Sequence, residues 1–335
     1  MQQQSERNDP NFLRGLSAAG KETHMEFGLF VEPQLGGSYR RLVDLAQWAE
    51  GIGLDAFARS DHYLHGETSA HATDAMVSLA GVAAETDSVR LVTLVSPITF
   101  RHPGVMAKAA TTLDEISGGR FTLGVGTGWM ESEHEAFGMD LPPLGERFDR
   151  FSEALAYIRA VFDGGGTADG EYYSLNAPSV QPTASDGLKI VVGGSGPKKT
   201  PTLAGQFADE YNMFVTDADT LAHRVSVMRA AARDAGRNPD DILVSVAGPG
   251  WVYQDEAAHR DALADKGEAK DMSGEEYGAF LDERNVPHGT VETAGAVISR
   301  LADVGVGRYY VQEFAALEAV DLDRMALVFE ALRKG

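Results

Sequence analysis

Residues 89–126 read VRLVTLVSPITFRHPGVMAKAATTLDEISGGRFTLGVG, and this stretch predicts a strand, a helix and a second strand. The first strand, VRLVTLVS (89–96), is apolar at most positions, as a strand buried on both faces should be. The helix follows Pro103, whose fixed φ suits a first helical turn, and it ends at SGG (117–119). The second strand, RFTLGVG (120–126), comes next. Short apolar strands that alternate with helices indicate a parallel sheet.

The same alternation recurs from Glu26 to the end of the chain. Each expected strand is followed by a helical pattern in which apolar residues lie three and four apart. The expected strands are 26–32, 54–60, 89–96, 120–126, 189–194, 208–214, 242–248 and 308–314. Eight such units predict a closed (β/α)8 barrel, and we expect residues 25–335 to form one domain. A doubly wound sheet with a second domain is the alternative, but no break in composition interrupts the alternation.

Two stretches depart from this pattern. Residues 164–188 are rich in Gly, Ser and Pro, and they predict an excursion after a helix at about 146–162. Residues 254–289 are long and charged, and we expect helices there and no strand.

Composition excludes several classes of protein. The chain has 335 residues, 43% of them hydrophobic, which is enough for a sizeable core. A net charge of −21 argues against nucleic acid or an anionic membrane as the main partner. The absence of cysteine excludes disulfides, thiolate catalysis and Cys-ligated metals. No apolar run approaches the roughly 18 residues of a membrane span, and no secretory signal is evident. We therefore expect a cytoplasmic protein, with a disordered polar tail at residues 1–24.

Barrel active sites lie at the carboxyl ends of the strands, and four of these ends carry polar, aromatic or Gly-rich segments. They are SDHY (60–63), SPITFRHP (96–103), GVGTGWMESEH (124–134) and GGSGPKKT (193–200). In the last one, accessible backbone N–H groups precede a helix, which is typical of an anion site. An ordinary Gly-rich turn is the other interpretation.

The glycines of GVGTG (124–128) do not follow the first strand, so they are a weak match to a dinucleotide fingerprint. They would instead let the backbone pass under a flat ring on which Trp129 stacks. His62 suits proton transfer or a hydrogen bond to a cofactor, and a capping histidine is the alternative. No GxSxG elbow accompanies it, which argues against a hydrolase triad. Glu131, Glu133 and His134 lack a recognised ligand spacing, so no metal is expected.

The segments at strand ends, taken in order, resemble the bacterial luciferase-like family of flavin and deazaflavin oxidoreductases. The matching segments are SDHY (60–63), RHPGVMAKAATTLDEISGGRFTLGVGTGW (101–129), ESEHEAFG (131–138), and GGSGPKKT (193–200) with ADEYN (208–212). The resemblance runs from about Met25 to the C-terminus, and it is greatest to the branch that uses coenzyme F420, a 5-deazaflavin. It implies a (β/α)8 barrel whose largest insertion follows strand seven, with the cofactor ring at the carboxyl-terminal mouth.

The resemblance also implies roles for individual residues. Asp61 and His62 match the positions that flank the ring, with His62 near its reactive face. A non-prolyl cis peptide at Leu94–Val95 is expected to back the ring. The implied cofactor-binding residues are Asp61, His62, Leu94, Val95, Thr127, Gly128, Trp129, Gly193, Gly194, Ser195 and Gly196, the last four as a phosphate loop. Some family members have a catalytic carboxylate where Trp129 stands, so Glu131 joins His62 and Asp61 as a candidate catalytic residue.

The implied function is hydride transfer between coenzyme F420 and a small organic substrate, under a lid formed by residues 61–73 and 249–289. The alternative is a two-component monooxygenase that uses FMN, oxygen and a partner flavin reductase. A third hypothesis, cofactor binding without catalysis, is disfavoured because Asp61, His62, Trp129 and the Gly-rich loop occur together. Barrels of this family commonly pair as homodimers, and the helices at about 74–86 and 103–117 are the candidate face. Ordinary barrel packing is the other reading of those helices.

Overall fold

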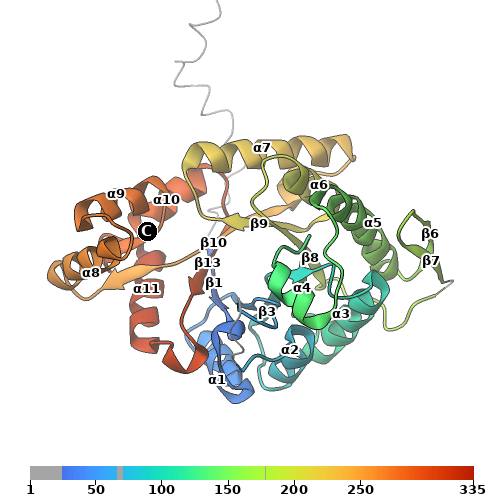
Figure 1. The fold of residues 1–335 in the computed structure, drawn as a ribbon, viewed down its shortest axis with the longest axis horizontal. Coiled ribbons are helices and arrows are strands. Elements are labelled where there is room, and N and C mark those ends of the chain that lie inside the picture. The colour runs from blue at the N-terminus through green and yellow to red at the C-terminus, as the bar shows by residue number, and fades with distance from the viewer. Residues whose placement is uncertain (1–24, 66–70, 178) are drawn as a thin grey trace, which may run out of the picture.

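Parallel strands close into a barrel in the computed structural model, which describes residues 25–65, 71–177 and 179–335 (Figure 1). The strands of the barrel are β1 (Glu26–Val31), β2 (Ala56–Arg59), β3 (Arg90–Thr93), β5 (Phe121–Gly126), β8 (Lys189–Gly193), β9 (Glu210–Phe214), β10 (Leu243–Gly248) and β13 (Arg308–Glu313). Their order is β3-β2-β1-β13-β10-β9-β8-β5, and β3 also pairs with β5. This last pairing closes the sheet, so the predicted (β/α)8 barrel is confirmed and the doubly wound alternative is wrong.

Helices surround this barrel and bury their apolar faces on the strands. They are α1 (Tyr39–Gly51), α2 (Ala75–Ala84), α3 (Pro103–Ser117), α5 (Leu144–Phe162), α6 (Lys199–Phe207), α7 (Ala218–Asp234), α10 (Ala296–Asp303) and α11 (Leu322–Lys334). Short 3-10 helices lie at Pro33–Leu35, Pro239–Asp241 and Leu317–Ala319. Helix α1 illustrates the local cause: the Ser38 hydroxyl caps it by accepting from Arg41 N–H, and Leu42, Leu45 and Ala49 are buried on one side. No helix in the described part of the chain is long and apolar enough to cross a membrane.

The interior of the barrel is a separate, smaller core. It consists of Phe30, Ala56, Ala58, Val92, Leu94, Val191, Ala247 and Tyr310, with Val95 packed against them. Below this layer, at the amino ends of the strands, Arg308 is buried and pairs with Glu26 and Glu210. Because the barrel is filled by these side chains, chemistry is confined to its carboxyl end.

The excursions differ in part from the expectation. Residues 164–188 contain an antiparallel hairpin, β6 (Gly166–Asp169) and β7 (Ser174–Ala177). The segment after β10 holds α8 (Glu256–Glu268) and α9 (Gly274–Glu283) between two paired strands, β11 (Trp251–Tyr253) and β12 (His288–Thr290). The expectation of no strand in 254–289 is therefore wrong at its last two residues, since a three-residue strand is too short to show a periodic pattern.

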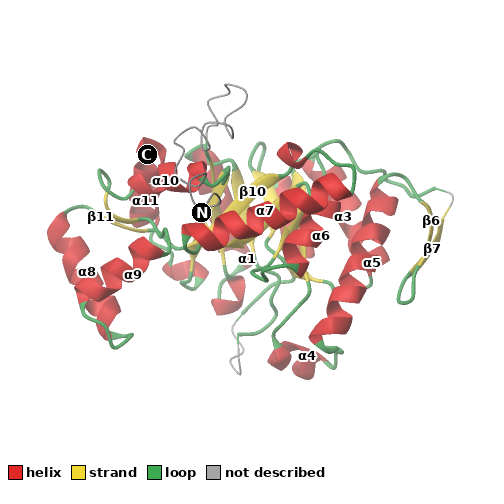
Figure 2. Ribbon diagram, turned by 90° about the horizontal axis from the view of Figure 1, so that it is seen from above, coloured by secondary structure: helices red, strands yellow, loops and turns green. Residues whose placement is uncertain are grey.

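A short helix that the sequence did not predict, α4 (Glu131–Phe137), follows β5. Its buried residues are polar, Glu133 and His134, so it lacks the apolar periodicity of the other helices. Figure 2 shows α4 and the pair α8 and α9 in the lower half of the view, and α4 follows the carboxyl end of β5 along the chain. Two elements outside the repeating pattern thus follow the carboxyl ends of barrel strands, β5 and β10.

The expected strand 89–96 is interrupted at its centre. β3 ends at Thr93, the Leu94–Val95 peptide is cis, and β4 (Ser96–Pro97) resumes the pairing with β5. The cis peptide implied by the family resemblance is confirmed. At this point the Thr93 hydroxyl accepts from Gly124 N–H at 2.9 Å and donates to Gly124 C=O at 3.0 Å. We call this contact between Thr93 and Gly124 the seam of the barrel.

The seam predicts that Gly124→Ala destabilises the protein. A Cβ on Gly124 would lie 1.9 Å from the carbonyl oxygen of Thr93, which is backbone and has no rotamer to change. We expect the free energy of unfolding to fall by about 2–3 kcal/mol, as for an overpacked core, in urea denaturation followed by circular dichroism. The control is Gly145→Ala in the first turn of α5, where no atom lies within 4 Å of the added Cβ and stability should not fall. Equal stability of both variants would contradict this role of Gly124.

Candidate active site

The loops after β2 and β3 are joined by a buried carboxylate, Asp61. It accepts hydrogen bonds from the Ser96 hydroxyl at 2.7 Å and from Arg101 at 2.5 Å. Arg101 also donates to the Tyr63 hydroxyl at 2.8 Å and pairs with Asp74, the N-cap of α2. Asp61 is fully buried, so it holds the backbone around His62 in place and does not itself face the mouth.

His62 is held by Glu133 of α4. The imidazole Nδ1 lies 2.7 Å from Glu133 Oε2, and the other carboxylate oxygen accepts from Tyr63 N–H at 2.5 Å and Leu64 N–H at 2.9 Å. Because a carboxylate only accepts, Nδ1 carries the proton and Nε2 is the ring nitrogen left for other partners. The His62 side chain is 17% exposed and that of Glu133 is 1% exposed.

Electrostatics favour the charged form of each member of this pair. Burial by itself would lower the pKa of His62, but the hydrogen bond that His62 donates to Glu133, together with nearby carboxylate charges, outweighs burial, and the pKa is raised above its usual value. Burial by itself would raise the pKa of Glu133, but the bond from His62 and the Tyr63 and Leu64 N–H groups lower it. An imidazolium stabilised in this way is suited to hold or release a proton near neutral pH.

Trp129 forms the wall next to His62. Its ring centroid lies 5.7 Å from that of His62 in an edge-on arrangement, and its side chain is 67% exposed. The preceding Gly128 has φ of +79°, and a Cβ there would lie 2.6 Å from Thr99 Oγ1. Thr127 is half-buried between this wall and β5. The predicted residues Thr127, Gly128 and Trp129 therefore come together beside the histidine, with a ring face open to a ligand.

Leu94 and Val95 lie between the ends of β5 and β8. A Cβ on Gly126 would lie 2.8 Å from one Val95 methyl carbon, and a Cβ on Gly193 would lie 2.6 Å from the other. The space above both glycines is thus taken by Val95, which packs against the interior core. This valine and the cis peptide before it make the floor of the mouth.

The Gly-rich loop after β8 leads into an uncapped helix. Gly194 N–H donates to Asn212 C=O at 3.1 Å, while Ser195 is exposed and Gly196 half-buried. Helix α6 begins at Lys199, and its N-cap Lys198 makes no side-chain capping bond. The first-turn N–H groups are therefore available to an anion. This is the arrangement that the predicted phosphate loop, Gly193 to Gly196, requires.

Glu131 takes a different position from the one expected for an acid. It is exposed at the first position of α4, and in the described part of the chain its side chain makes no hydrogen bond or ion pair. Glu133, two residues later, is the carboxylate that contacts His62. The sequence offered no basis for choosing between these glutamates, because α4 was not predicted and its buried face is polar.

A second buried carboxylate that sequence reasoning missed is Glu32, directly after β1. It accepts from Gln34 at 2.6 Å and from Gln312 of β13 at 2.5 Å. The negative charge of Glu32 also contributes to the raised pKa of His62. Among residues 25–65, 71–177 and 179–335, no three His, Asp or Glu side chains are placed to hold a metal ion.

Glu133→Gln should lower the pKa of His62, because the imidazolium loses its carboxylate partner. The pKa is measured by NMR titration of the ring nitrogens. The stability that the pair contributes is present below the unfolded pKa of His62 and is lost as pH rises through the raised folded value. At the acid end it is lost as pH falls through the lowered pKa of Glu133. The stability difference from wild type should therefore become smaller at alkaline pH, where only the bonds from Tyr63 N–H and Leu64 N–H to the carboxylate remain.

The control is Glu135→Gln, at an exposed position of the same helix, which should leave the His62 titration unchanged. A His62 pKa that is the same in wild type and in Glu133→Gln would show that Glu133 does not set it.

The chain is similar in sequence to two kinds of known oxidoreductase. The chain is 34% identical over 209 residues to an F420-dependent glucose-6-phosphate dehydrogenase of Microbacterium testaceum, covering 60% of this chain and 61% of that protein. The chain thus spans about three fifths of the length of this curated relative. It is 27% identical over 319 residues to the pyrimidine monooxygenase RutA of Pseudomonas savastanoi, covering 83% of this chain and 87% of that protein.

The fold is shared with the coenzyme F420-dependent tetrahydromethanopterin reductase of Methanopyrus kandleri. The TM-score is 0.71 at 20% identity, covering 93% of this chain and 98% of that structure. Residues 25–305 match the model of the luciferase-like monooxygenase family. The match covers most of the chain, which therefore belongs to the luciferase-like monooxygenase family.

Proposed function

We propose that this protein is an oxidoreductase that transfers a hydride between coenzyme F420 and a small organic substrate. The observation that carries the proposal is the Glu133-held His62 beside the exposed ring of Trp129. The named activity of the Microbacterium relative supports the choice of F420, although the similarity covers only part of both chains.

The residues present fit such a cofactor. Gly126 and Gly193 have no side chain, and the Val95 between them makes a flat apolar floor against which a ring can lie. Trp129 offers an exposed aromatic face at one side. The uncapped start of α6 behind Gly193 to Gly196 suits a phosphate. Coenzyme F420, when bound, supplies a ring carbon that accepts or donates a hydride and reacts poorly with oxygen.

The chain's own residues then orient the reacting groups and move a proton. His62 would exchange a proton with the substrate at Nε2, while Glu133 holds Nδ1. Asp61 acts as a positioning residue through Ser96 and Arg101. The role of Glu131 as a further acid stays a prediction. Glu131 is exposed, so the lid of residues 61–73 and 249–289 would have to bring the substrate to it. Residues 66–70 of that lid lie outside the described residues.

The second candidate is a two-component monooxygenase that takes reduced FMN from a partner reductase and reacts it with oxygen. The similarity to the pyrimidine monooxygenase RutA favours it, because it extends over more of the chain than the similarity to the dehydrogenase. The same floor and phosphate loop would serve FMN. The cytoplasmic location expected from the sequence stays a prediction under both hypotheses.

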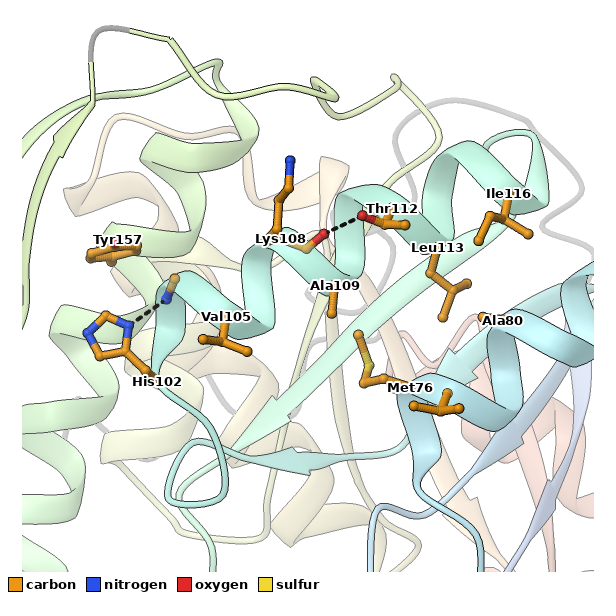
Figure 3. Close-up of a pocket in the computed structure, with 12 residues that line it drawn as sticks. Met76, Ala80, His102, Val105, Lys108, Ala109, Thr112, Leu113, Ile116 and Tyr157 are labelled. Carbon is orange, nitrogen blue, oxygen red and sulfur yellow. Dashed lines mark hydrogen bonds between the residues drawn. The ribbon is translucent and has the colours of Figure 1, made fainter.

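We also propose that two copies pair through α2 and α3. An apolar groove of about 770 Å³ lies between these helices on the outside of the barrel. Figure 3 shows Val105, Ala109 and Leu113 of α3 turned toward Met76 and Ala80 of α2. Val77 is 74% exposed and Val105 is 60% exposed. Exposed apolar side chains gathered along two helices are typical of an interface between copies.

The cofactor proposal predicts that the purified protein binds coenzyme F420 far more tightly than FMN. Binding is measured by cofactor fluorescence, and we expect a Kd in the micromolar range or below for F420. His62→Ala should keep this Kd within a few-fold, because the phosphate loop and floor are unchanged. A preference for FMN would instead support the monooxygenase, and binding of neither cofactor would contradict both candidates.

The dimer proposal predicts that wild type elutes as a particle of twice the 35.9 kDa chain mass, measured by light scattering. Val105→Asp should shift it to the monomer, since a carboxylate buried in an apolar interface is costly. The control Leu144→Asp alters a similarly exposed residue at the start of α5 and should remain dimeric. A monomeric wild type would contradict pairing through α2 and α3.

A further inference from the structure

Exposed aromatic side chains follow three strands at the mouth of the barrel. Phe214 is the last residue of β9 and is 58% exposed, Phe314 follows the end of β13 and is 52% exposed, and Trp129 follows β5. Elsewhere in the core, phenylalanines such as Phe57, Phe121 and Phe329 are fully buried. Large aromatic groups left in water at a site are typical of a surface that a ligand covers.

The strand register places two of these rings on the inner face of the barrel. Phe214 pairs with Ala247, which belongs to the interior core. Phe314 lies two residues after Gln312, and Gln312 pairs with the interior residue Phe30. Side chains two apart in an extended strand point the same way. Phe214 therefore points toward the mouth, and Phe314, one residue beyond the end of β13, continues the same alternation.

A hydrogen-bond acceptor without a partner lies on the same inner face. Gln312 donates its amide to Glu32 Oε1 at 2.5 Å, and Glu32 Oε2 accepts from Gln34, whose own oxygen accepts from Ser60 at 2.7 Å. Since a carboxylate cannot donate, the amide nitrogen of Gln312 must face Glu32, and this orients Gln312 Oε1. That oxygen is buried and has no hydrogen-bond partner in the described part of the chain, and Gln312 is only 5% exposed. A donor from a ligand would remove the cost of leaving it unpaired.

The charges around this face are unfavourable for an anionic substrate. Glu32 and Glu133 are buried carboxylates. Burial lowers the pKa of His62, whereas its hydrogen bond to Glu133 and the negative charges of Glu133 and Glu32 raise it. The guanidinium groups nearby are already engaged. Arg101 pairs with Asp61 and Asp74, Arg147 donates to Gly128 C=O, and Arg324 pairs with Glu313. A phosphate placed beside Glu32 would meet its negative charge, and the buried Arg59, whose charge couples to Glu32, already donates to Thr73 and Ser78.

From these three observations we infer that the substrate is an uncharged molecule with an apolar body and a hydroxyl or other hydrogen-bond donor. The apolar body contacts Phe214 and Phe314, and the donor bonds to Gln312 Oε1. This inference rests on the proposed function, because it assigns the substrate side of the same mouth. It separates this protein from the dehydrogenase it resembles, whose named substrate is a sugar phosphate.

The test compares probes on the full chain saturated with coenzyme F420, by isothermal titration calorimetry. Cyclohexanol has the apolar body and the donor, cyclohexanone has the body alone, and glucose 6-phosphate has neither an apolar body nor neutrality. We expect cyclohexanol to bind more tightly than cyclohexanone and glucose 6-phosphate to bind most weakly. Phe214→Ala should weaken cyclohexanol binding by about tenfold, equivalent to about 1.4 kcal/mol. Gln312→Met should abolish the difference between alcohol and ketone.

Two controls keep the outcomes distinct. Ile116→Ala truncates an apolar side chain of comparable exposure on the outer face of α3, and it should change no probe's affinity. Because Phe214 is exposed, its replacement tests the inference even if Gln312→Met does not fold. If F420 binds but glucose 6-phosphate binds as tightly as cyclohexanol, this inference is overturned while the proposed function stands. Failure to bind F420 overturns the proposed function, and the inference with it.

Discussion

The structure depends on the close backbone contact at the seam between Thr93 and Gly124. There the sheet closes on itself, and the Thr93 hydroxyl bonds to both backbone groups of Gly124 where the regular ladder between β3 and β5 has ended. A side chain on Gly124 would occupy the place of the Thr93 carbonyl. Closure of the barrel turns the eight strand ends toward one mouth. The contacts of the candidate site join loops from different strand ends, so they depend on this closure.

The site is built from bonds that each connect two different strand ends. Asp61 after β2 bonds Ser96 of β4 and Arg101 after it, and Glu133 of α4 after β5 bonds His62 and the backbone after it. Both carboxylates are buried, so their loss would leave unpaired partners in a dry environment. The imidazole is therefore oriented before any ligand arrives, which is the condition for efficient proton transfer. The aromatic side chains at the rim, by contrast, are exposed and free to meet a ligand.

Sequence reasoning located the segments of the site more reliably than its individual contacts. His62, Asp61, Trp129 and the Gly-rich loop were predicted because they directly follow strands whose apolar pattern is clear. Glu133 was not selected, since three glutamates fall in seven residues and only the turn of α4 decides which of them reaches His62. The hydrogen bond between Glu32 and Gln312 was invisible because 280 residues separate its two ends.

The amino-acid sequence by itself determined the eight-fold alternation, the barrel and the end of it that carries chemistry. These follow from apolar periodicity and from turn residues, which act over a few neighbouring positions. Only the tertiary structure decided which carboxylate holds His62, that Val95 fills the space above Gly126 and Gly193, and that Phe214 and Phe314 face the mouth. Those outcomes depend on the register between strands and on the direction of each side chain. Such long-range geometry is set by closure and leaves no local pattern.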